Sequence, residues 1–314
     1  MRVPILVYHE RAADKYAAFL TAHGCTQVYT AANGEEARTR LAETPIEVIY
    51  GYGFPLDAIA ASNTVRWVQL MSAGVDAVLR QGRLPSHITL TRMLDVFSRP
   101  MAEYAFAYLL HIEKEIDRLR EQQVSNTWKS FRAGVLHDKT IGVAGLGSIG
   151  QDVVKKARAF DMTVYGMSRS GAQSATVDRH FTPDLWLDFV KELDYLVLTL
   201  PLTDKTRHAV NESVLGAMKR DAILVNVGRG ALVDERALVS ALRDRRLRAA
   251  ALDVFEVEPL PSDSLLWTLS NAYVTPHMSG PTTVENAGQY FLDNLKRYEQ
   301  GLQLPGVVDW ETGY

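Results

Sequence analysis

The chain has 314 residues, of which 47% are hydrophobic and 23% are charged, with a formal net charge of −3. This length favours two domains of ordinary size, and the composition is too apolar and too balanced for a disordered chain. Neither a basic block nor a long apolar run is present, so neither nucleic acid nor a membrane is an expected partner. Cys25 is the only cysteine, which excludes an internal disulfide and favours a reducing, cytoplasmic location.

Strand and helix patterns alternate from the start of the chain. The opening apolar run is interrupted by polar residues, so it predicts a β-strand rather than a signal peptide. Strands are predicted at 3–8, 48–50, 67–70 and 88–91, and helical spacing occupies 15–23 and 34–42. Such alternation is typical of a parallel sheet with helices on its faces.

A second strand–helix series follows a predicted long helix at 101–123. Its strands are predicted at 140–144, 163–165, 193–200, 222–225, 249–252 and 273–275. The closing segment 283–300 has apolar residues at helical spacing, so we expect it to pack back onto the first sheet. The sequence therefore predicts an α/β fold of two Rossmann-like, doubly wound parallel-sheet domains. The substrate-binding domain would comprise 1–99 and 282–314, and the dinucleotide-binding Rossmann domain 100–281.

Residues 141–150 read Ile-Gly-Val-Ala-Gly-Leu-Gly-Ser-Ile-Gly, a G-x-G-x-x-G motif between a strand and a helix. Gly145 permits a tight turn, Gly147 lets backbone amides approach a pyrophosphate, and Gly150 lets helix and strand pack closely. The helix N-terminus then faces the phosphates. The predicted site also includes Leu146, Ser148 and Ile149. The alternative is a glycine-rich turn that binds no ligand. The flanking strand and helix favour the dinucleotide site over this alternative.

The next strand runs into Ser168, Arg169 and Ser170 without an acidic residue. Sites that select NAD usually carry a carboxylate there, about 20 positions past the glycines, for the ribose 2′-hydroxyl. A guanidinium and two hydroxyls suit a 2′-phosphate instead. The sequence therefore predicts NADP(H). NAD(H) is the alternative if Arg169 is a solvated surface residue or only stacks on the adenine.

Arg229, Glu258 and His277 are candidate catalytic residues, and Arg229 is placed to bind an anion. Arg229 stands between glycines just after a predicted strand, where a site at the sheet edge would lie. Singly, each residue has an ordinary structural explanation: an ion-pair partner for Arg229, an exposed turn for Glu258, and a turn or core position for His277.

Taken together and in this order, the segments resemble the D-2-hydroxyacid dehydrogenase family, and within it the glyoxylate/hydroxypyruvate reductase A-like branch. The resemblance covers nearly the whole chain. It rests on segments 67–76, 101–104, 141–150, 200–207, 225–230, 253–261, 275–277 and 308–314. It implies an oxidoreductase acting on small 2-keto or 2-hydroxy acids. It also implies a homodimer, with the segment around 101–123 near the contact. A connector between the domains with one solvated face is the alternative for this segment.

The resemblance implies roles for the three residues. Arg229 would bind the substrate carboxylate and polarise the keto oxygen, His277 would donate the proton, and Glu258 would be the partner of His277. Hydride transfer to the carbonyl carbon leaves charge on oxygen, which a cation stabilises and an imidazolium neutralises. Because a neighbouring carboxylate raises the pKa of a histidine, His277 is expected to start protonated in the direction of reduction.

The resemblance also implies further site residues. Ala73 and Gly74 belong to a loop whose amides would hold the substrate carboxylate, although the same segment also fits an ordinary strand-to-helix turn. Tyr52 would line the substrate pocket, and Met101 would touch the nicotinamide ring. The remaining contacts with the dinucleotide would come from Leu200, Pro201, Val227, Gly228, Arg229, Asp253 and His277, with Asp253 near the carboxamide. No metal site is predicted.

Two departures from the family pattern leave alternatives open. Ser279 stands where most members have alanine, and the Gly-Pro step after it is expected to alter the pocket or the closure of the domains. The missing acid near Arg169 puts NAD in doubt, but an NAD-dependent D-2-hydroxyacid or phosphoglycerate-type dehydrogenase is an alternative. A formate dehydrogenase fits less well, because those enzymes pair the histidine with glutamine. A non-enzymatic dinucleotide sensor or corepressor is the alternative from another class, although a sensor needs no proton donor.

Overall fold

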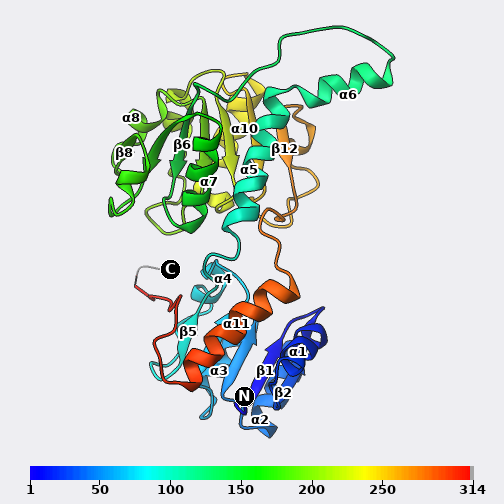
Figure 1. Cartoon of the computed structure of the whole chain (residues 1–314), viewed down its shortest axis with the longest axis vertical. Helices are drawn as coiled ribbons and strands as arrows, with labels where there is room; N and C mark the ends of the chain where they lie inside the picture. Colours follow the sequence, from blue (N-terminus) through cyan, green and yellow to red (C-terminus); the bar gives the residue numbers. More distant parts are fainter. Residues whose placement is uncertain (312–314) are drawn as a thin grey trace. The chain divides into compact units, whose positions relative to one another are not determined.

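The computed structural model describes residues 1–311, so the end of segment 308–314 lies outside the described residues. The chain divides into two units. The first contains Met1–Phe97 and the chain from Thr282 onward, and the second contains Ser98–Pro281. These limits lie next to the predicted boundaries at 99 and 281. Each unit is built around its own parallel sheet, which confirms the predicted fold class (Figure 1).

The first unit contains a five-stranded sheet in the order β2–β1–β3–β4–β5, and all neighbouring strands are parallel. Its strands are β1 (Ile5–Tyr8), β2 (Val28–Ala31), β3 (Val48–Gly51), β4 (Trp67–Leu70) and β5 (Thr89–Thr91). Its helices are α1 (Ala13–Ala22), α2 (Gly34–Glu43), α3 (Leu56–Ala60), α4 (Asp76–Leu79) and α11 (Val284–Glu299).

Helix α11 returns from the second unit to cover the sheet of the first. The Phe291 ring stacks on Tyr50 with a centroid separation of 4.2 Å and on Trp67 with a separation of 5.3 Å. The buried Asn294 amide donates a hydrogen bond of 3.0 Å to Oε1 of Gln69 in β4. The predicted closing helix and its packing onto the first sheet are therefore confirmed.

The second unit contains a seven-stranded parallel sheet in the order β12–β11–β10–β9–β6–β7–β8. Its strands are β6 (Thr140–Ala144), β7 (Thr163–Met167), β8 (Arg179–Phe181), β9 (Tyr195–Leu198), β10 (Ile223–Asn226), β11 (Ala249–Leu252) and β12 (Ala272–Val274). Its α-helices are α5 (Ser98–Glu113), α6 (Ile116–Val124), α7 (Ser148–Ala159), α8 (Trp186–Val190), α9 (Glu212–Ala217) and α10 (Glu235–Arg243). Short 3₁₀ turns occupy η1 (Ser174–Thr176), η2 (Gly230–Leu232) and η3 (Leu265–Thr268).

Both faces of this sheet are covered by apolar side chains. Along β9, Leu196 and Leu198 belong to one core, and Tyr195 and Val197 belong to the other. Side chains alternate between faces along a strand, so a strand buried on both faces is apolar at every position. This pattern explains why the sequence predicts the central strands.

Strands β2 and β8 are absent from the sequence prediction, and both lie at an edge of their sheet. Only one of the four residues of β2 is fully buried, and β8 begins with the exposed Arg179. An edge strand has less apolar surface to bury, so its sequence carries a weaker periodic signal.

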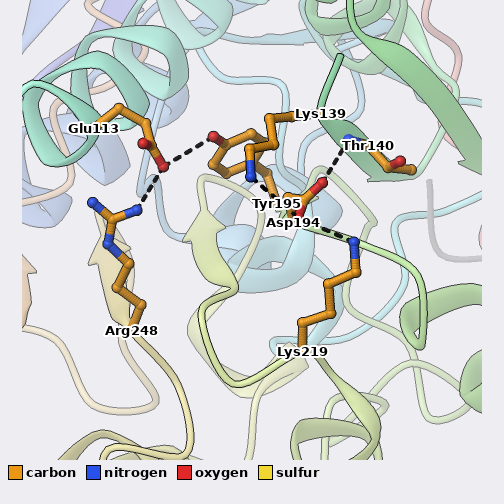
Figure 2. Close-up of polar contacts among 7 residues, drawn as sticks. All are labelled: Glu113, Lys139, Thr140, Asp194, Tyr195, Lys219 and Arg248. Atoms are coloured by element: carbon orange, nitrogen blue, oxygen red, sulfur yellow. Dashed lines mark hydrogen bonds and ion pairs between the residues drawn. The ribbon is translucent and has the colours of Figure 1, made fainter. Parts of the chain in front are cut away.

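The single long helix predicted at 101–123 is wrong, because the chain forms α5 and α6 with a break between them. Glu115 adopts a left-handed backbone with φ of 48°. Just before it, the carboxylate of Glu113 is buried and accepts hydrogen bonds from Arg248 at 2.7 Å and from the Tyr195 hydroxyl at 2.9 Å (Figure 2). Lys114 in turn donates to the carbonyl oxygen of Gly134 at 2.7 Å. These contacts join residues distant in sequence, so local periodicity does not reveal them.

The amino-terminal edge of the second sheet carries one more polar cluster. Asp194, just before β9, accepts a hydrogen bond of 2.8 Å from the backbone N–H of Thr140 at the start of β6. Its other oxygen lies 3.0 Å from the Lys219 ammonium (Figure 2). Ion pairs and hydrogen bonds therefore link neighbouring strands at this edge, and the carboxyl ends of the same strands form the opposite edge.

Candidate active site

The predicted dinucleotide turn lies at the point where the strand order of the second sheet reverses. Strand β6 has β7 on one side and β9 on the other. In open parallel sheets, ligands bind outside the carboxyl ends of the strands at such a point. Gly145 follows β6 directly and has a φ of +104°, a conformation that favours glycine. A Cβ at this position would lie 2.8 Å from Oγ1 of Thr199, so the turn is also closely packed.

Gly147 and Gly150 meet the other two requirements of the motif. Gly147 is the N-cap of α7, and a Cβ there would meet no atom within 4 Å among the described residues. A Cβ on Gly150 would collide with the carbonyl oxygen of Gly145. The helix therefore begins close against the strand end, with open space in front of its first amides. This arrangement fits the pyrophosphate of a dinucleotide.

The three residues predicted to meet the adenosine end follow β7. The backbone N–H of Ser168 donates to the carbonyl oxygen of Phe181 at 3.2 Å, and the Ser168 hydroxyl lies 2.8 Å from Nε2 of His180. Arg169 and Ser170 are exposed. The segment 167–170 contains no carboxylate.

A buried asparagine that the sequence analysis missed organises the loop after β10. Asn226 is 1% exposed, and its side-chain oxygen accepts a hydrogen bond of 3.1 Å from the N–H of Gly228. Its amide donates to the carbonyl oxygen of Arg229 at 2.9 Å. A Cβ on Gly228 would lie 3.0 Å from the carbonyl oxygen of Leu200. The loop 227–229 is thus adjacent to the end of β9, where Pro201 follows.

Arg229 lies beside the segment that contains Glu258. Its guanidinium donates to the carbonyl oxygen of Gly228 at 2.7 Å. A Cβ on Gly230 would collide with the backbone of Phe255, which brings the two loops into contact. The charge of Arg229 acts electrostatically on both Glu258 and His277. The structure therefore brings together the three residues predicted for the chemistry.

His277 and Glu258 form the central pair of this site. Nδ1 of His277 lies 2.8 Å from Oε2 of Glu258, and because a carboxylate only accepts, the imidazole donates. This hydrogen bond raises the pKa of His277, and the charge of Glu258 adds to the effect. Burial and the charge of Arg229 act in the opposite direction without cancelling it. The histidine therefore tends to keep its second proton, and Nε2 is left to face a ligand.

The pKa of Glu258 reflects competing effects. Burial alone would raise it. The hydrogen bonds from His277 and from the backbone N–H of Phe255, at 3.0 Å, act against burial and leave the pKa of Glu258 below its ordinary value. The carboxylate is therefore charged when the imidazole is protonated, which is the state that proton donation requires.

Asp253 is fully buried beneath the His277 loop. Its Oδ1 accepts hydrogen bonds of 2.6 Å from the Thr275 hydroxyl and 2.8 Å from the N–H of Met278. Its Oδ2 accepts a hydrogen bond of 2.8 Å from the N–H of Ser279. The contact of Asp253 with the nicotinamide carboxamide stays a prediction. The role of Thr275 was not predicted, because no local sequence pattern indicates it.

Tyr52, Ala73 and Gly74 belong to the first unit and lie at the carboxyl ends of its strands. Tyr52 follows β3 and is 50% exposed. The loop after β4 is shaped by Ser72, whose hydroxyl donates to the carbonyl oxygen of Gly74 at 2.8 Å. Arg92, which the sequence analysis missed, donates to the carbonyl oxygen of Ala73 at 3.4 Å. Their contact with a substrate stays a prediction.

Two further findings concern residues 1–311. None of their helices combines the length and apolarity needed to span a bilayer. Within the same residues, no group of three or more histidine, cysteine, aspartate or glutamate side chains is arranged to hold a metal ion.

Met101, in the first turn of α5, is partly buried against one core of the second unit.

Comparisons with known proteins agree with this geometry. Residues 106–279 match the family model described as D-isomer specific 2-hydroxyacid dehydrogenase, NAD binding domain. A glyoxylate/hydroxypyruvate reductase A from Yersinia enterocolitica is 33% identical over 267 residues, which cover 83% of this chain and 85% of the relative. A D-3-phosphoglycerate dehydrogenase from Methanocaldococcus jannaschii is 33% identical over 295 residues, and this chain spans only 56% of its length.

Solved structures that are similar over their full length include the following one. It is an NADPH-dependent glyoxylate/hydroxypyruvate reductase from Sinorhizobium meliloti in complex with NADP and sulfate. The TM-score is 0.89 with 28% sequence identity, and the match covers 100% of both chains. The chain therefore belongs to the D-isomer specific 2-hydroxyacid dehydrogenases, a family of NAD(P)-binding oxidoreductases.

Proposed function

We propose that this protein reduces small 2-keto acids of the glyoxylate or hydroxypyruvate type to 2-hydroxy acids, with NADPH as the reductant. The observation that carries the proposal is the pairing of His277 with Glu258 beside Arg229. A protonated imidazole next to a fixed cation is suited to an oxo acid, whose carboxylate needs a countercharge and whose ketone needs a proton.

The roles follow from the chemistry of each group. Arg229 binds the substrate carboxylate and polarises the keto oxygen. When bound, NADPH supplies the hydride that adds to the carbonyl carbon. Nε2 of His277 delivers its proton to the oxygen, so a hydride and a proton together convert the ketone to an alcohol. Glu258 stabilises the imidazolium before transfer and holds its orientation afterwards. On the first unit, Ala73 and Gly74 present backbone amides to the carboxylate, and Tyr52 lines the pocket.

The choice of NADPH rests on the end of β7. The absence of a carboxylate at 167–170 removes the usual partner of the ribose 2′-hydroxyl. Arg169, with Ser168 and Ser170, provides donors for a 2′-phosphate. The NADP-bound relative from Sinorhizobium meliloti supports the same choice. The proposal also includes a homodimer and a cytoplasmic location.

The first test is the initial rate of nicotinamide oxidation with glyoxylate and with hydroxypyruvate, with NADPH and NADH in parallel. Faster turnover with NADPH is expected. Preferential use of NADH would reject the cofactor assignment but keep the reaction class. A clear preference for 3-phosphohydroxypyruvate would favour the phosphoglycerate-type alternative. Tight NADPH binding with no turnover of any 2-keto acid would favour the sensor alternative. Light scattering of the eluting protein would test the dimer.

A further inference from the structure

A chain of short hydrogen bonds connects helix α5 to the loop that carries His277. The hydroxyl of Tyr104, on α5, lies 2.7 Å from Oγ1 of Thr275. Thr275 in turn donates to Oδ1 of Asp253 at 2.6 Å. All of these residues lie in the second unit, and none of them is required by the proton transfer described above.

The direction of this chain is fixed by the number of protons. Asp253 accepts from one hydroxyl and two backbone N–H groups, a pattern that suits a carboxylate anion. The hydroxyl of Thr275 has one proton and gives it to Asp253, so Thr275 accepts from Tyr104. Burial, with a contribution from the charge of Asp253, raises the pKa of Tyr104, and the phenol therefore remains a donor. The relay runs one way, from Tyr104 through Thr275 to Asp253.

The carboxylate at the end of the relay holds the backbone on both sides of His277. Thr275 precedes the histidine, and Met278 and Ser279 follow it. His277 itself has a φ of 50°, in the left-handed region. That conformation is unfavourable for a non-glycine residue, so it persists only where neighbouring contacts hold it. Asp253 supplies those contacts, and the hydroxyl of Thr275, which accepts from Tyr104, donates to the same carboxylate.

We propose that Tyr104 and Thr275 are positioning residues, whose hydroxyls align the His277 loop so that the imidazole meets Glu258 and the keto oxygen at the correct angle. This inference rests on the proposed function. Without the Thr275 hydroxyl, Asp253 loses one donor, and without the Tyr104 hydroxyl, Thr275 loses the donor that orients it. In either case the loop relaxes. The contact between His277 and Glu258 then weakens, and proton donation becomes slower.

Helix α5 presents Tyr104 from a fixed position, because its far end is anchored separately. There, Glu113 accepts hydrogen bonds from Tyr195 and Arg248 at the amino-terminal edge of the sheet (Figure 2). The buried Tyr195 hydroxyl donates to the Glu113 carboxylate, just as the relay ends on the Asp253 carboxylate. Tyr195, however, lies at the edge of the sheet opposite the candidate active site. Tyr195→Phe is therefore the control for Tyr104→Phe, because each removes one hydroxyl from a hydrogen bond made by a residue of the same helix.

The test compares kcat, KM and the pH profile of keto-acid reduction in these variants. In Tyr104→Phe, kcat should fall about tenfold, within the hundredfold that a misplacement of 1 Å can cause, with little change in KM. The alkaline limb of the profile should move to lower pH, because His277 loses part of its contact with Glu258. Of the other charges that act on His277, those of Arg229 and Asp253 remain. Tyr195→Phe should lower thermal stability but leave kcat and the alkaline limb unchanged.

Thr275 gives an independent version of the same test. Thr275→Val removes the hydroxyl with little change of shape and should reproduce the effect of Tyr104→Phe, whereas Thr275→Ser should restore the wild-type profile. The double variant Tyr104→Phe/Thr275→Val should be no worse than Thr275→Val alone, because both act through one chain. Independent, additive losses would overturn the relay, as would a Tyr104→Phe enzyme that matches Tyr195→Phe in rate and pH profile.

A titration of His277 by NMR separates this inference from the proposed function, because it requires no turnover. The His277 signal can be assigned by its absence in His277→Gln. If the wild-type protein reduces no keto acid but the His277 pKa falls in Tyr104→Phe and not in Tyr195→Phe, the relay stands and the proposed function fails. An unchanged His277 pKa in Tyr104→Phe would overturn the relay, even if the wild type is an active reductase.

Discussion

Nδ1 of His277 and Oε2 of Glu258 lie 2.8 Å apart and share one hydrogen bond, which makes the histidine more basic and the glutamate more acidic than usual. A pair of this kind remains charged over a wider pH range than either residue alone. Under the proposed mechanism, the state of the pair sets the pH range in which the site can donate a proton.

The first prediction concerns this pH range. Reduction requires the protonated imidazole, and the pKa of His277 is raised, so the rate should hold as pH rises until the raised pKa is reached and decline above it. In Glu258→Gln the main cause of the shift is lost. The alkaline limb should then move to lower pH and kcat should fall, which a pH–rate profile measures. If the alkaline limb keeps its position in Glu258→Gln, the limb reports the titration of another group.

The second prediction is that His277→Gln lowers kcat roughly 10²- to 10⁴-fold, the usual contribution of a general acid. Glutamine retains a hydrogen-bonding side chain but has no transferable proton. Dinucleotide affinity, measured by fluorescence titration, should change little. Near-normal turnover would remove His277 from the role of proton donor.

The third prediction concerns Arg229 and the substrate carboxylate. Arg229→Ala should raise KM for the keto acid and lower kcat, with a loss in kcat/KM on the order of 10²- to 10³-fold. Arg229→Lys keeps the charge but loses the planar fork, so its loss should be intermediate. Steady-state kinetics with glyoxylate provide the measurement. If both constants stay at wild-type values in Arg229→Ala, the carboxylate binds elsewhere.

The fourth prediction concerns the choice of dinucleotide. Arg169→Ala should reduce the preference for NADPH over NADH by about ten- to a hundredfold, since a hydrogen bond to a charged group contributes about 1.5–3 kcal/mol. The ratio of kcat/KM values for the two cofactors is the readout. Arg243→Ala removes an exposed arginine at the end of α10 and is the control. Equal ratios in wild type and Arg169→Ala would mean that the guanidinium does not bind the 2′-phosphate.

The fifth prediction concerns the glycine turn. Gly150→Ala places a Cβ against the carbonyl oxygen of Gly145, so α7 must shift away from the strand end and dinucleotide affinity should fall. Gly216→Ala is the control, because a Cβ at this position in α9 meets nothing within 4 Å among the described residues. It should leave affinity unchanged and stabilise the fold slightly, by up to about 1 kcal/mol. Normal affinity in Gly150→Ala would show that the close contact is not required.

The sequence predicts best the parts of the molecule in which local pattern and burial coincide. The central strands are apolar throughout, and the glycines near Gly145 stand between a strand and a helix, so both are recognisable. The order of Arg229, Glu258 and His277 is recognisable through the family resemblance. The edge strands β2 and β8 are half-exposed and escape detection.

Features that depend on contacts between distant segments could not be predicted in this way. The break at Glu115 arises because Glu113 is held by residues more than 80 positions away along the chain. Asn226 and Thr275 shape the site through buried hydrogen bonds to backbone and side chains of other loops. A single polar residue in such a position has no periodicity and no fixed spacing, so only the fold reveals its function.

The return of α11 to the first unit has a consequence for synthesis of the protein. The first sheet is complete once β5 has emerged from the ribosome, but Tyr50 and Trp67 lack the Phe291 ring that covers them until α11 has also emerged. The second unit is continuous in sequence, and domains generally fold as units. It can therefore fold before α11 completes the first unit. The nascent chain therefore exposes part of an aromatic surface while the second unit is made.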